Sequence, residues 1–502
     1  MKRFMIFIFF ILNILLSQKL PVSWYKSQSS DYLTNGLLRL NSFLQIPNAS
    51  RDSIDISANV LWCREVFDEL GFVVNYYEVS STPFLFASKL INNSLPTVLV
   101  YLQIDGVPVE LSQWNQDNPY ISIVRNRKKE IIDWNDFILD PKIDDKIFAR
   151  SASDSKGPAV AFITALQVIK EKNIEIPFNV KVIMDFQEEI SSPDLPKLVK
   201  MESSTLKADY LLIMDGSRFI DNKPTLTFGA RGISKIELTI YGPKNPVHSG
   251  QYGNFIPNPV FEAARLISSL KDKDGIVSIP GWYGSVNIEE DEFFLMEKNS
   301  IDPLEFAHSF GVADYEKVGK TYQESLQYPS LNIRGISAGW IGNNARTIIP
   351  DKVEMVFDIR LVPEMDGETA IGMVRDYLRK MKYRIIESEP SDRIRTRYSK
   401  LVKFSSSIGY PAFQTPLNSP IGEWLNRAHM NALGNYPISI RRTGGSQPMA
   451  PFVKVLGLPA VSVRIPNPDN NIHGPNENIR VGNFLEGIQI NLGILTTPIN
   501  DR

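Results

Sequence analysis

Three short, largely apolar runs, each followed at once by acidic or amide side chains, constrain the fold of this 502-residue chain more than any other feature. They cover residues 96–102, 180–186 and 210–214, and amphipathic helical patterns separate them. Continuous apolar runs of this length are typical of strands buried on both faces of a parallel sheet. Strands that alternate with helices predict an α/β domain with a doubly wound, mostly parallel sheet.

The carboxyl ends of these runs carry most of the acidic residues that could form a site. Asp105, Glu188, Glu189 and Asp215 each follow a run within a few positions. In an open α/β sheet, ligands bind in the crevice beyond the carboxyl ends of the strands. We therefore expect these carboxylates to converge, although they lie far apart in the sequence.

A fifth acidic residue, Asp154, lies where a loop of small and charged residues enters a helix. Pro158 suits the first turn of that helix because no backbone N–H is needed there. Taken alone, Asp154 is better explained by a structural role, since the helix dipole favours an acid at this end. Its expected place beside the strand ends is what points to a site.

From about residue 230 the pattern becomes that of a half-exposed sheet. Ile236, Leu238 and Ile240 alternate with polar residues, as in a strand with one buried face. The order strand, helix, two strands, helix, strand follows to about residue 387 and predicts an α+β, ferredoxin-like domain. The α/β pattern then returns with a helix at 421–433 and an apolar run at 460–463. The predicted division is a signal peptide at 1–18, a first domain at 19–229 and 405–502, and an inserted domain at 230–404.

The amino terminus and the cysteine content bear on location. Lys2 and Arg3 precede an apolar run at 4–16 that is too short to cross a bilayer comfortably, which predicts a secretory signal, either cleaved or retained as an anchor. Cys63 is the only cysteine, so no intrachain disulfide forms. We expect a secreted or periplasmic protein with no stable membrane span after cleavage, and the lack of disulfides favours a periplasm.

The charge balance excludes one class of partner. The formal net charge is −2 and no long run of like charge occurs, so nothing in the sequence indicates nucleic acid or an anionic membrane surface.

The expected carboxylates, with His473 after the last apolar run, predict a divalent metal site. Carboxylates a few ångströms apart repel one another unless cations neutralise them. One or two divalent ions would do so, zinc by default and manganese or cobalt as alternatives for a carboxylate-rich pair. Such ions activate water, and Glu188 or Glu189 could remove its proton. Each residue alone also has an ordinary explanation, a solvated acidic pair or a surface histidine, so the pattern leaves both open.

Several segments resemble, in the same order, the motifs of the M20 metallopeptidases, in particular the carnosinase-like dipeptidases and related carboxypeptidases and deacylases. Residues 153–158 are similar to the family's Asp-Asp-Lys-Gly-Pro segment and residues 188–192 to its Glu-Glu-x-Gly-Ser segment. The resemblance implies that Asp154 bridges two metals, that Glu188 is the general base, and that Glu189, Asp215 and His473 are metal ligands.

The inserted domain carries further matches. His248 lies in a His-Ser-Gly segment, and the resemblance implies that its imidazole stabilises the oxyanion, from the partner subunit of a homodimer formed through this lid domain. Segments that match substrate-binding motifs contain Thr347, Arg360, Gly445 and Ser446. Arg360 would pair with the terminal carboxylate of the substrate, although it also fits a surface charge on a lid strand.

One departure from the family pattern falls on a metal ligand. The His of the family's Gly-His-x-Asp segment is replaced by Gln103, and the Gly before it by Leu102. Asp105 is retained, and the resemblance implies a catalytic role for it. An amide oxygen is a weaker zinc ligand than imidazole. We therefore expect one ion held by Asp154, Glu189 and His473, and a second that is weak or lost. The remaining histidines, His308 and His429, match no motif.

The predicted function is metal-dependent hydrolysis of a dipeptide or short peptide. A deacylase that acts on an N-acyl amino acid differs only on the acyl side of the cleft, so the sequence leaves it open. A binding protein that kept the cleft and lost the chemistry is the other alternative, and Gln103 is the feature that favours it.

Overall fold

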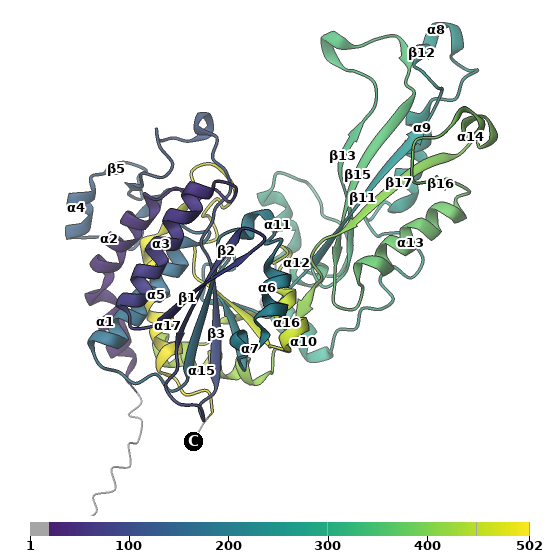
Figure 1. Cartoon of the computed structure of the whole chain (residues 1–502). Helices are drawn as coiled ribbons and strands as arrows, with labels where there is room; N and C mark the ends of the chain where they lie inside the picture. Colours follow the sequence, from purple (N-terminus) through teal and green to yellow (C-terminus); the bar gives the residue numbers. More distant parts are fainter. Residues whose placement is uncertain (1–19, 299, 448, 501–502) are drawn as a thin grey trace, which may run out of the picture.

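The computed structural model describes residues 20–298, 300–447 and 449–500, so the predicted signal peptide lies outside the described residues. Figure 1 shows two bodies: an α/β domain, and a smaller domain that projects from it at one side. Within the described part of the chain, no helix is both long and apolar enough to cross a membrane.

The larger domain is built on an eight-stranded sheet with a parallel centre. Strands β7, β3, β8 and β20 run parallel to one another, and antiparallel strands flank this set on both sides. This confirms the predicted fold class. In sheet order the strands are β1 (Val73–Val79), β2 (Thr82–Lys89), β7 (Asn179–Asp185), β3 (Thr97–Gln103), β8 (Tyr210–Ile213), β20 (Ala460–Arg464), β9 (Thr225–Thr227) and β19 (Ile438–Ile440).

Both faces of this sheet are covered, which is why its strands read as continuous apolar runs. Along β3, Val98, Val100 and Leu102 lie in one core, and Leu99 and Tyr101 lie in the other. The first core is closed by helices α1 (Val22–Asp31), α2 (Leu33–Leu44), α3 (Ser53–Glu69), α5 (Lys156–Glu171), α15 (Pro420–Leu433) and α17 (Val481–Thr496). The second is closed by α6 (Leu195–Met201), α7 (Ser203–Leu206) and α16 (Ala450–Leu456).

The hairpin of β1 and β2 forms one edge of the main sheet, with β2 next to β7. Ser80 and Ser81 form its turn with positive φ values of 51° and 71°. The pattern at 82–89 mixes apolar with polar residues and a proline, so it gives a weak strand signal. The hairpin is therefore an addition that periodicity did not predict.

The projecting domain carries its own five-stranded sheet, in the order β13 (Ser330–Ser337), β15 (Lys352–Leu361), β11 (Gly232–Tyr241), β17 (Leu401–Ile408), β16 (Arg384–Ile386). Helices α9 (Pro259–Leu270) and α13 (Gly367–Lys380) pack on this sheet. The sequence pattern predicts the segment at 384–387 as the last strand, but β17 lies between it and β11. Strand β17 gives a weak strand signal in the sequence, because the serines at 405–407 leave only its first half apolar.

An insertion with helices α10 (Glu290–Lys298), α11 (Pro303–Ser309) and α12 (Tyr322–Ser325) leads from this domain back to the larger one. Arg441 of the larger domain forms an ion pair with Glu292 of α10 (Nε to Oε1, 2.9 Å) and donates to Gln327 (2.9 Å). The two domains are thus joined by packed polar contacts as well as by the chain.

A small four-stranded sheet lies over the loops that follow the central strands. Its strands are β21 (Asn478–Arg480), β6 (Lys146–Phe148), β4 (Ile123–Arg125) and β5 (Ile131–Ile132). Pairing of Asn478 with Phe148 brings the end of the His473 loop against the start of the Asp154 loop. This pairing fixes two candidate metal-binding loops relative to each other.

Candidate metal centre and active-site crevice

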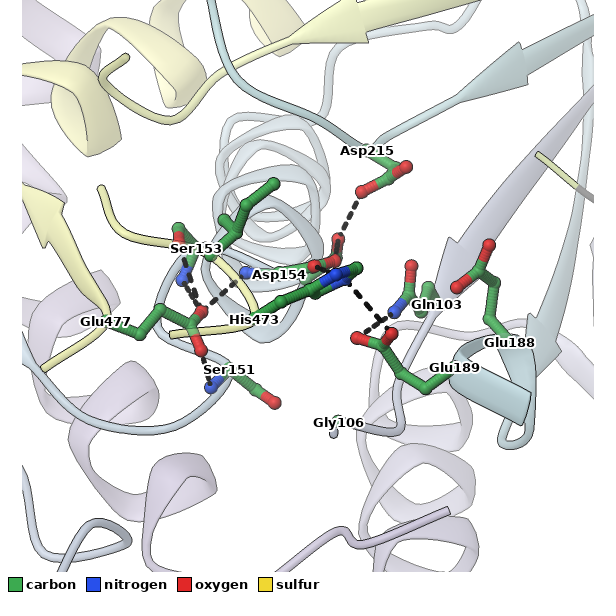
Figure 2. Close-up of polar contacts among 12 residues, drawn as sticks. Gln103, Gly106, Ser151, Ser153, Asp154, Glu188, Glu189, Asp215, His473 and Glu477 are labelled. Carbon is green, nitrogen blue, oxygen red and sulfur yellow. Dashed lines mark hydrogen bonds and ion pairs between the residues drawn. The ribbon is translucent and has the colours of Figure 1, made fainter. Parts of the chain in front are cut away.

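Three of the predicted ligands form a compact cluster at the carboxyl edge of the main sheet. His473 Nε2 lies 3.1 Å from Asp154 Oδ2 and 3.1 Å from Glu189 Oε2. One potential ligand atom from each residue lies within 4.8 Å of the others. Figure 2 shows the imidazole placed between the two carboxylates, which come from different loops. Segments separated by some 300 positions therefore meet at one point.

Local backbone geometry presents each ligand to the crevice. Asp154 lies just before α5, and Glu189 lies on a single 3₁₀ turn (Glu188–Ile190) that follows β7. His473 has a left-handed backbone conformation with φ of 58°, which is uncommon for a residue other than glycine. Such conformations gather at functional sites, where the surrounding contacts hold them in place.

The loop that carries Asp154 is held by a buried carboxylate that the sequence analysis missed. Glu477 accepts the backbone N–H groups of Ser151, Ser153 and Asp154, each at 2.9 Å. The same carboxylate pairs with Arg150 (Nη1 to Oε2, 2.7 Å), and both side chains are buried. No periodicity links positions so far apart. The only available cue was that Glu477 follows His473 by four residues.

Asp105 holds the turn that carries the other acidic residues. Its buried carboxylate accepts the backbone N–H of Glu188 at Oδ1 and that of Glu189 at Oδ2, both at 3.0 Å. Burial, together with the nearby carboxylate of Asp185, raises the pKa of Asp105 well above its usual value. Asp105 therefore fixes the direction in which Glu188 and Glu189 leave the backbone.

Gln103 lies at the end of β3 and faces the cluster. Its amide nitrogen donates to Glu189 Oε1 at 3.1 Å, as Figure 2 shows.

Glu188, on the same turn as Glu189, is free of any side-chain hydrogen bond to Gln103. Burial, followed by the charges of Asp215 and Glu189, raises the pKa of the Glu188 carboxyl well above its usual value.

Asp215 lies at the edge of the cluster and is engaged by other side chains. Ser155 Oγ donates to Asp215 Oδ1 at 2.8 Å and lies 3.1 Å from Asp154 Oδ1. Gln447 Nε2 donates to Asp215 Oδ2 at 2.8 Å. The predicted convergence thus includes Asp215, but through hydrogen bonds and outside the set of three that Asp154, Glu189 and His473 form.

The chemistry of that set of three fits a divalent cation. Burial, opposed by the hydrogen bond with His473 and reinforced by the charges of Glu189 and Asp215, raises the pKa of the Asp154 carboxyl to about 8. Hydrogen bonds to Asp154 and Glu189 raise the pKa of the His473 imidazole to about 11. Two neighbouring carboxylates are stabilised by a cation between them. Carboxylate oxygens and an imidazole nitrogen are ligands that bind zinc and similar divalent ions.

The predicted substrate-binding residues fall into two separate groups. Arg360 of β15 donates from Nη1 to Ser446 Oγ at 3.0 Å, next to Gly445, where the lid domain meets the loop that also carries Gln447. Asp358 lies 3.6 Å from Arg360 Nε, and the arginine remains partly exposed. These contacts place Arg360, Gly445 and Ser446 within reach of the crevice.

His248 and Thr347 lie elsewhere, at the outer tip of the lid domain. Strand β12 (Val247–His248) pairs with β14 (Ile348–Ile349), and Ser249 donates its backbone N–H to the carbonyl of Thr347 at 3.2 Å. Figure 1 shows β12 and helix α8 (Ser249–Tyr252) at the end of the lid farthest from the main sheet. Within one chain, His248 is therefore remote from the metal-binding cluster.

A cavity of about 460 Å³ lies apart from this cluster, within the lid insertion, between helices α11 and α12 and strand β13. Arg231 reaches it from the hinge and donates to the carbonyl of Gly444 at 3.3 Å. The site is therefore located by the clustered ligand atoms and not by this cavity.

Comparisons with known proteins bear on the fold and on the kind of protein that this chain resembles. A family model described as the peptidase dimerisation domain, M20_dimer, matches residues 228–385. The Cys-Gly metallodipeptidase dug1 of Schizosaccharomyces pombe is 27% identical over 402 residues, covering 79% of each chain. A solved M20 family metallo-carboxypeptidase from Sulfolobus solfataricus superimposes with a TM-score of 0.75 at 26% identity, covering 92% of this chain and 99% of its own. The chain is thus similar to M20 peptidases in its dimerisation domain, over most of its sequence and in its fold.

Other M20 relatives extend the likeness. The Beta-Ala-His dipeptidase of Homo sapiens is 28% identical over 357 residues, which cover 70% of this chain and 68% of that protein. The comparisons contradict the predicted secreted or periplasmic location, because the yeast Cys-Gly dipeptidases that this chain resembles are cytosolic enzymes. A basic pair and a short apolar run at one terminus were too little evidence for export.

Proposed function

We propose that this chain hydrolyses the amide bond of a dipeptide or short peptide in a metal-dependent reaction. The observation that carries the proposal is the cluster of Asp154, Glu189 and His473, with the acidic side chain of Glu188 on the same turn as Glu189. The relatives described as Cys-Gly metallodipeptidases and Beta-Ala-His dipeptidases support the reaction class.

Asp154, Glu189 and His473 would hold the metal ion, and zinc, manganese or cobalt would suit them. When bound, such an ion acidifies a water molecule and polarises a carbonyl group. The hydrogen bonds that the Glu477 carboxylate accepts from the backbone of Ser153 and Asp154 keep the Asp154 loop in place for this role. Asp105 does the same for the turn that carries Glu189.

Glu188 is the general base in this proposal. Its backbone is fixed by Asp105, so its side chain leaves the turn next to Glu189 without being needed as a ligand. A carboxylate in that place would remove the proton from the attacking water and later return it to the leaving amine. Asp105 acts through the backbone of Glu188 and is a positioning residue.

The carboxylate of the substrate would bind where the two domains meet. Arg360 offers a guanidinium that pairs with a carboxylate in two parallel hydrogen bonds. The Ser446 hydroxyl already accepts from Arg360, and the backbone of Gly445 lies beside it. A free carboxyl end on the substrate is the feature that this group would recognise. An N-acyl amino acid shares that feature and remains a second candidate substrate.

His248 would act in the site of a partner subunit. It lies at the lid tip with Thr347, inside the segment that matches the peptidase dimerisation domain. A homodimer formed through the lid would bring this tip to the neighbour's crevice. There His248 would stabilise the oxyanion and Thr347 would contact the substrate.

The test uses the purified full chain, a mixed dipeptide pool and a parallel pool of N-acetyl amino acids, with product amines read by mass spectrometry. We expect hydrolysis of dipeptides that chelation abolishes and that added zinc or manganese restores. The Glu188→Gln variant is the control for contaminating peptidases. A folded, metal-loaded chain that binds dipeptides without cleaving them would favour the binding protein that Gln103 suggests.

A further inference from the structure

If this site held two metal ions, Asp154 and Asp215 would be the carboxylates that bind the second one. In this chain, Asp215 has both carboxylate oxygens engaged by neutral donors. Ser155 Oγ donates to Oδ1 and Gln447 Nε2 donates to Oδ2, each at 2.8 Å. Gln447 is in turn oriented by Ser462, whose hydroxyl donates to its amide oxygen at 3.3 Å. Asp215 is thus satisfied without an ion.

A fixed positive charge lies beside the same carboxylate. Arg464, at the end of β20 and two residues after Ser462, is 6% exposed, so its guanidinium is buried under the crevice. Its Nε donates to Thr227 Oγ1 at 3.2 Å, while its Nη2 is buried without a hydrogen-bond partner. An unpartnered buried guanidinium nitrogen is costly unless nearby negative charge compensates for it.

The backbone next to Asp215 is shaped around this guanidinium. Gly216 has a φ of +88°, and a Cβ atom there would lie 1.3 Å from Arg464 Nη1. Only glycine lets the guanidinium approach the chain at this point. The charge of Arg464 interacts with both Asp215 and Asp154, the two carboxylates that a second metal would share.

Gln103, the other residue expected at a second metal site, is also unsuited to binding a cation. Gln103 stands where a histidine ligand is expected, and its amide nitrogen points to Glu189. An N–H₂ group donates hydrogen bonds and cannot coordinate a metal. Asp215, Gln103 and their neighbours therefore form a hydrogen-bonded network with a built-in cation, and this does not fit a second metal ion.

We propose that Arg464 takes the place of the second metal, with Gln103 bonded to Glu189 and Gln447 bonded to Asp215, so that the chain holds a single divalent ion at Asp154, Glu189 and His473. The inference deepens the proposed function and rests on it. The guanidinium keeps the charge of the crevice balanced when the first ion is bound, and it repels a second ion.

The test is the metal content of the full chain after equilibration with zinc or manganese and dialysis, read by plasma mass spectrometry. We expect one tightly held equivalent, and in the manganese form an electron paramagnetic resonance spectrum without coupling between two ions. The Gln103→His variant should still hold one equivalent, because Arg464 remains. The double variant Gln103→His with Arg464→Gln should hold two. Arg375→Gln, on the outer helix α13 of the lid, is the matched control and should hold one.

Two tight equivalents in the unaltered chain would overturn the inference, whether or not the variants fold. A folded double variant that still holds one ion would also overturn it. The proposed function is tested separately. A chain that holds one ion and cleaves no dipeptide would contradict the proposed function and leave this inference standing. A chain that holds two ions and cleaves dipeptides would support the proposed function and contradict this inference.

Discussion

Glu477 accepts the backbone N–H of Asp154 at 2.9 Å, so a residue four positions after one candidate ligand holds the backbone of another in place. The same carboxylate binds Arg150 and two further backbone N–H groups. Glu477 therefore couples the geometry of the two loops that contribute Asp154 and His473.

Replacing Glu477 with Gln should weaken metal binding without removing any ligand. The amide keeps one acceptor oxygen but leaves Arg150 buried without its counter-charge, which costs about 3 kcal/mol of stability. We expect metal affinity to fall by roughly tenfold or more, as for other residues that orient ligands. Isothermal titration with zinc measures this, and thermal unfolding measures the stability. Unchanged affinity in a destabilised variant would assign Glu477 a purely structural role.

Substitutions at Glu188 and Glu189 should separate proton transfer from metal binding. Glu188→Gln should abolish turnover, by about 10²-fold or more, with metal content unchanged, because only the base is lost. Glu189→Gln should release metal, because one of the clustered carboxylates is lost. Metal analysis and dipeptide turnover on the same samples check both. If Glu188→Gln kept full activity, another group would have to be the base.

Mixing two inactive variants should restore activity if His248 acts across a dimer. His248→Ala and Glu188→Gln leave one intact site in each mixed dimer, so equal mixing should recover about a quarter of full activity. Each variant should be inactive alone. Light scattering reports the assembly, and a chain that is monomeric and fully active would rule out a site completed by the partner.

His429 should make the fold sensitive to mild acid. It is fully buried in α15, its Nδ1 contacts the carbonyl of Leu425 at 2.8 Å, and burial lowers the pKa of the imidazole to about 4. The unfolded chain takes up this proton near pH 6.5, so the contribution to stability is complete above that pH and is lost as the pH falls toward 4. The full loss corresponds to roughly 3 kcal/mol.

His429→Leu should remove that acid-dependent loss. Urea unfolding at pH 7 and at pH 4.5 gives the comparison, and the difference between the two pH values should shrink in the variant. An equal pH dependence in both proteins would assign the acid sensitivity to other groups.

Leu102 should matter to the core and not to the metal site. Its side chain lies in the first core of the main sheet, on the face of β3 opposite to that of Gln103. Leu102→Gly therefore opens a cavity, and we expect a loss of about 4 kcal/mol in the free energy of unfolding. Metal content measured in the folded fraction should not change. A gain of bound metal in this variant would show that Leu102 crowds the crevice.

Sequence periodicity was sufficient for the central strands and for the shared position of the acidic residues, because strands buried on both faces leave long apolar runs. It failed for β17, whose serines face solvent in the outer half of the lid sheet. It also failed for contacts such as Arg150 with Glu477 and Arg464 with Gly216. Pairs of this kind depend on how distant loops meet, and no local pattern records that.

The pairing of β21 with β6 has a consequence for biosynthesis. His473 and Glu477 are translated long after Asp154 and Glu189, so they are the last of these crevice residues to leave the ribosome. Until β21 adds to β6, the earlier acidic residues lack the imidazole and the carboxylate that organise them. A nascent chain should therefore acquire its affinity for metal only after β21 has left the ribosome.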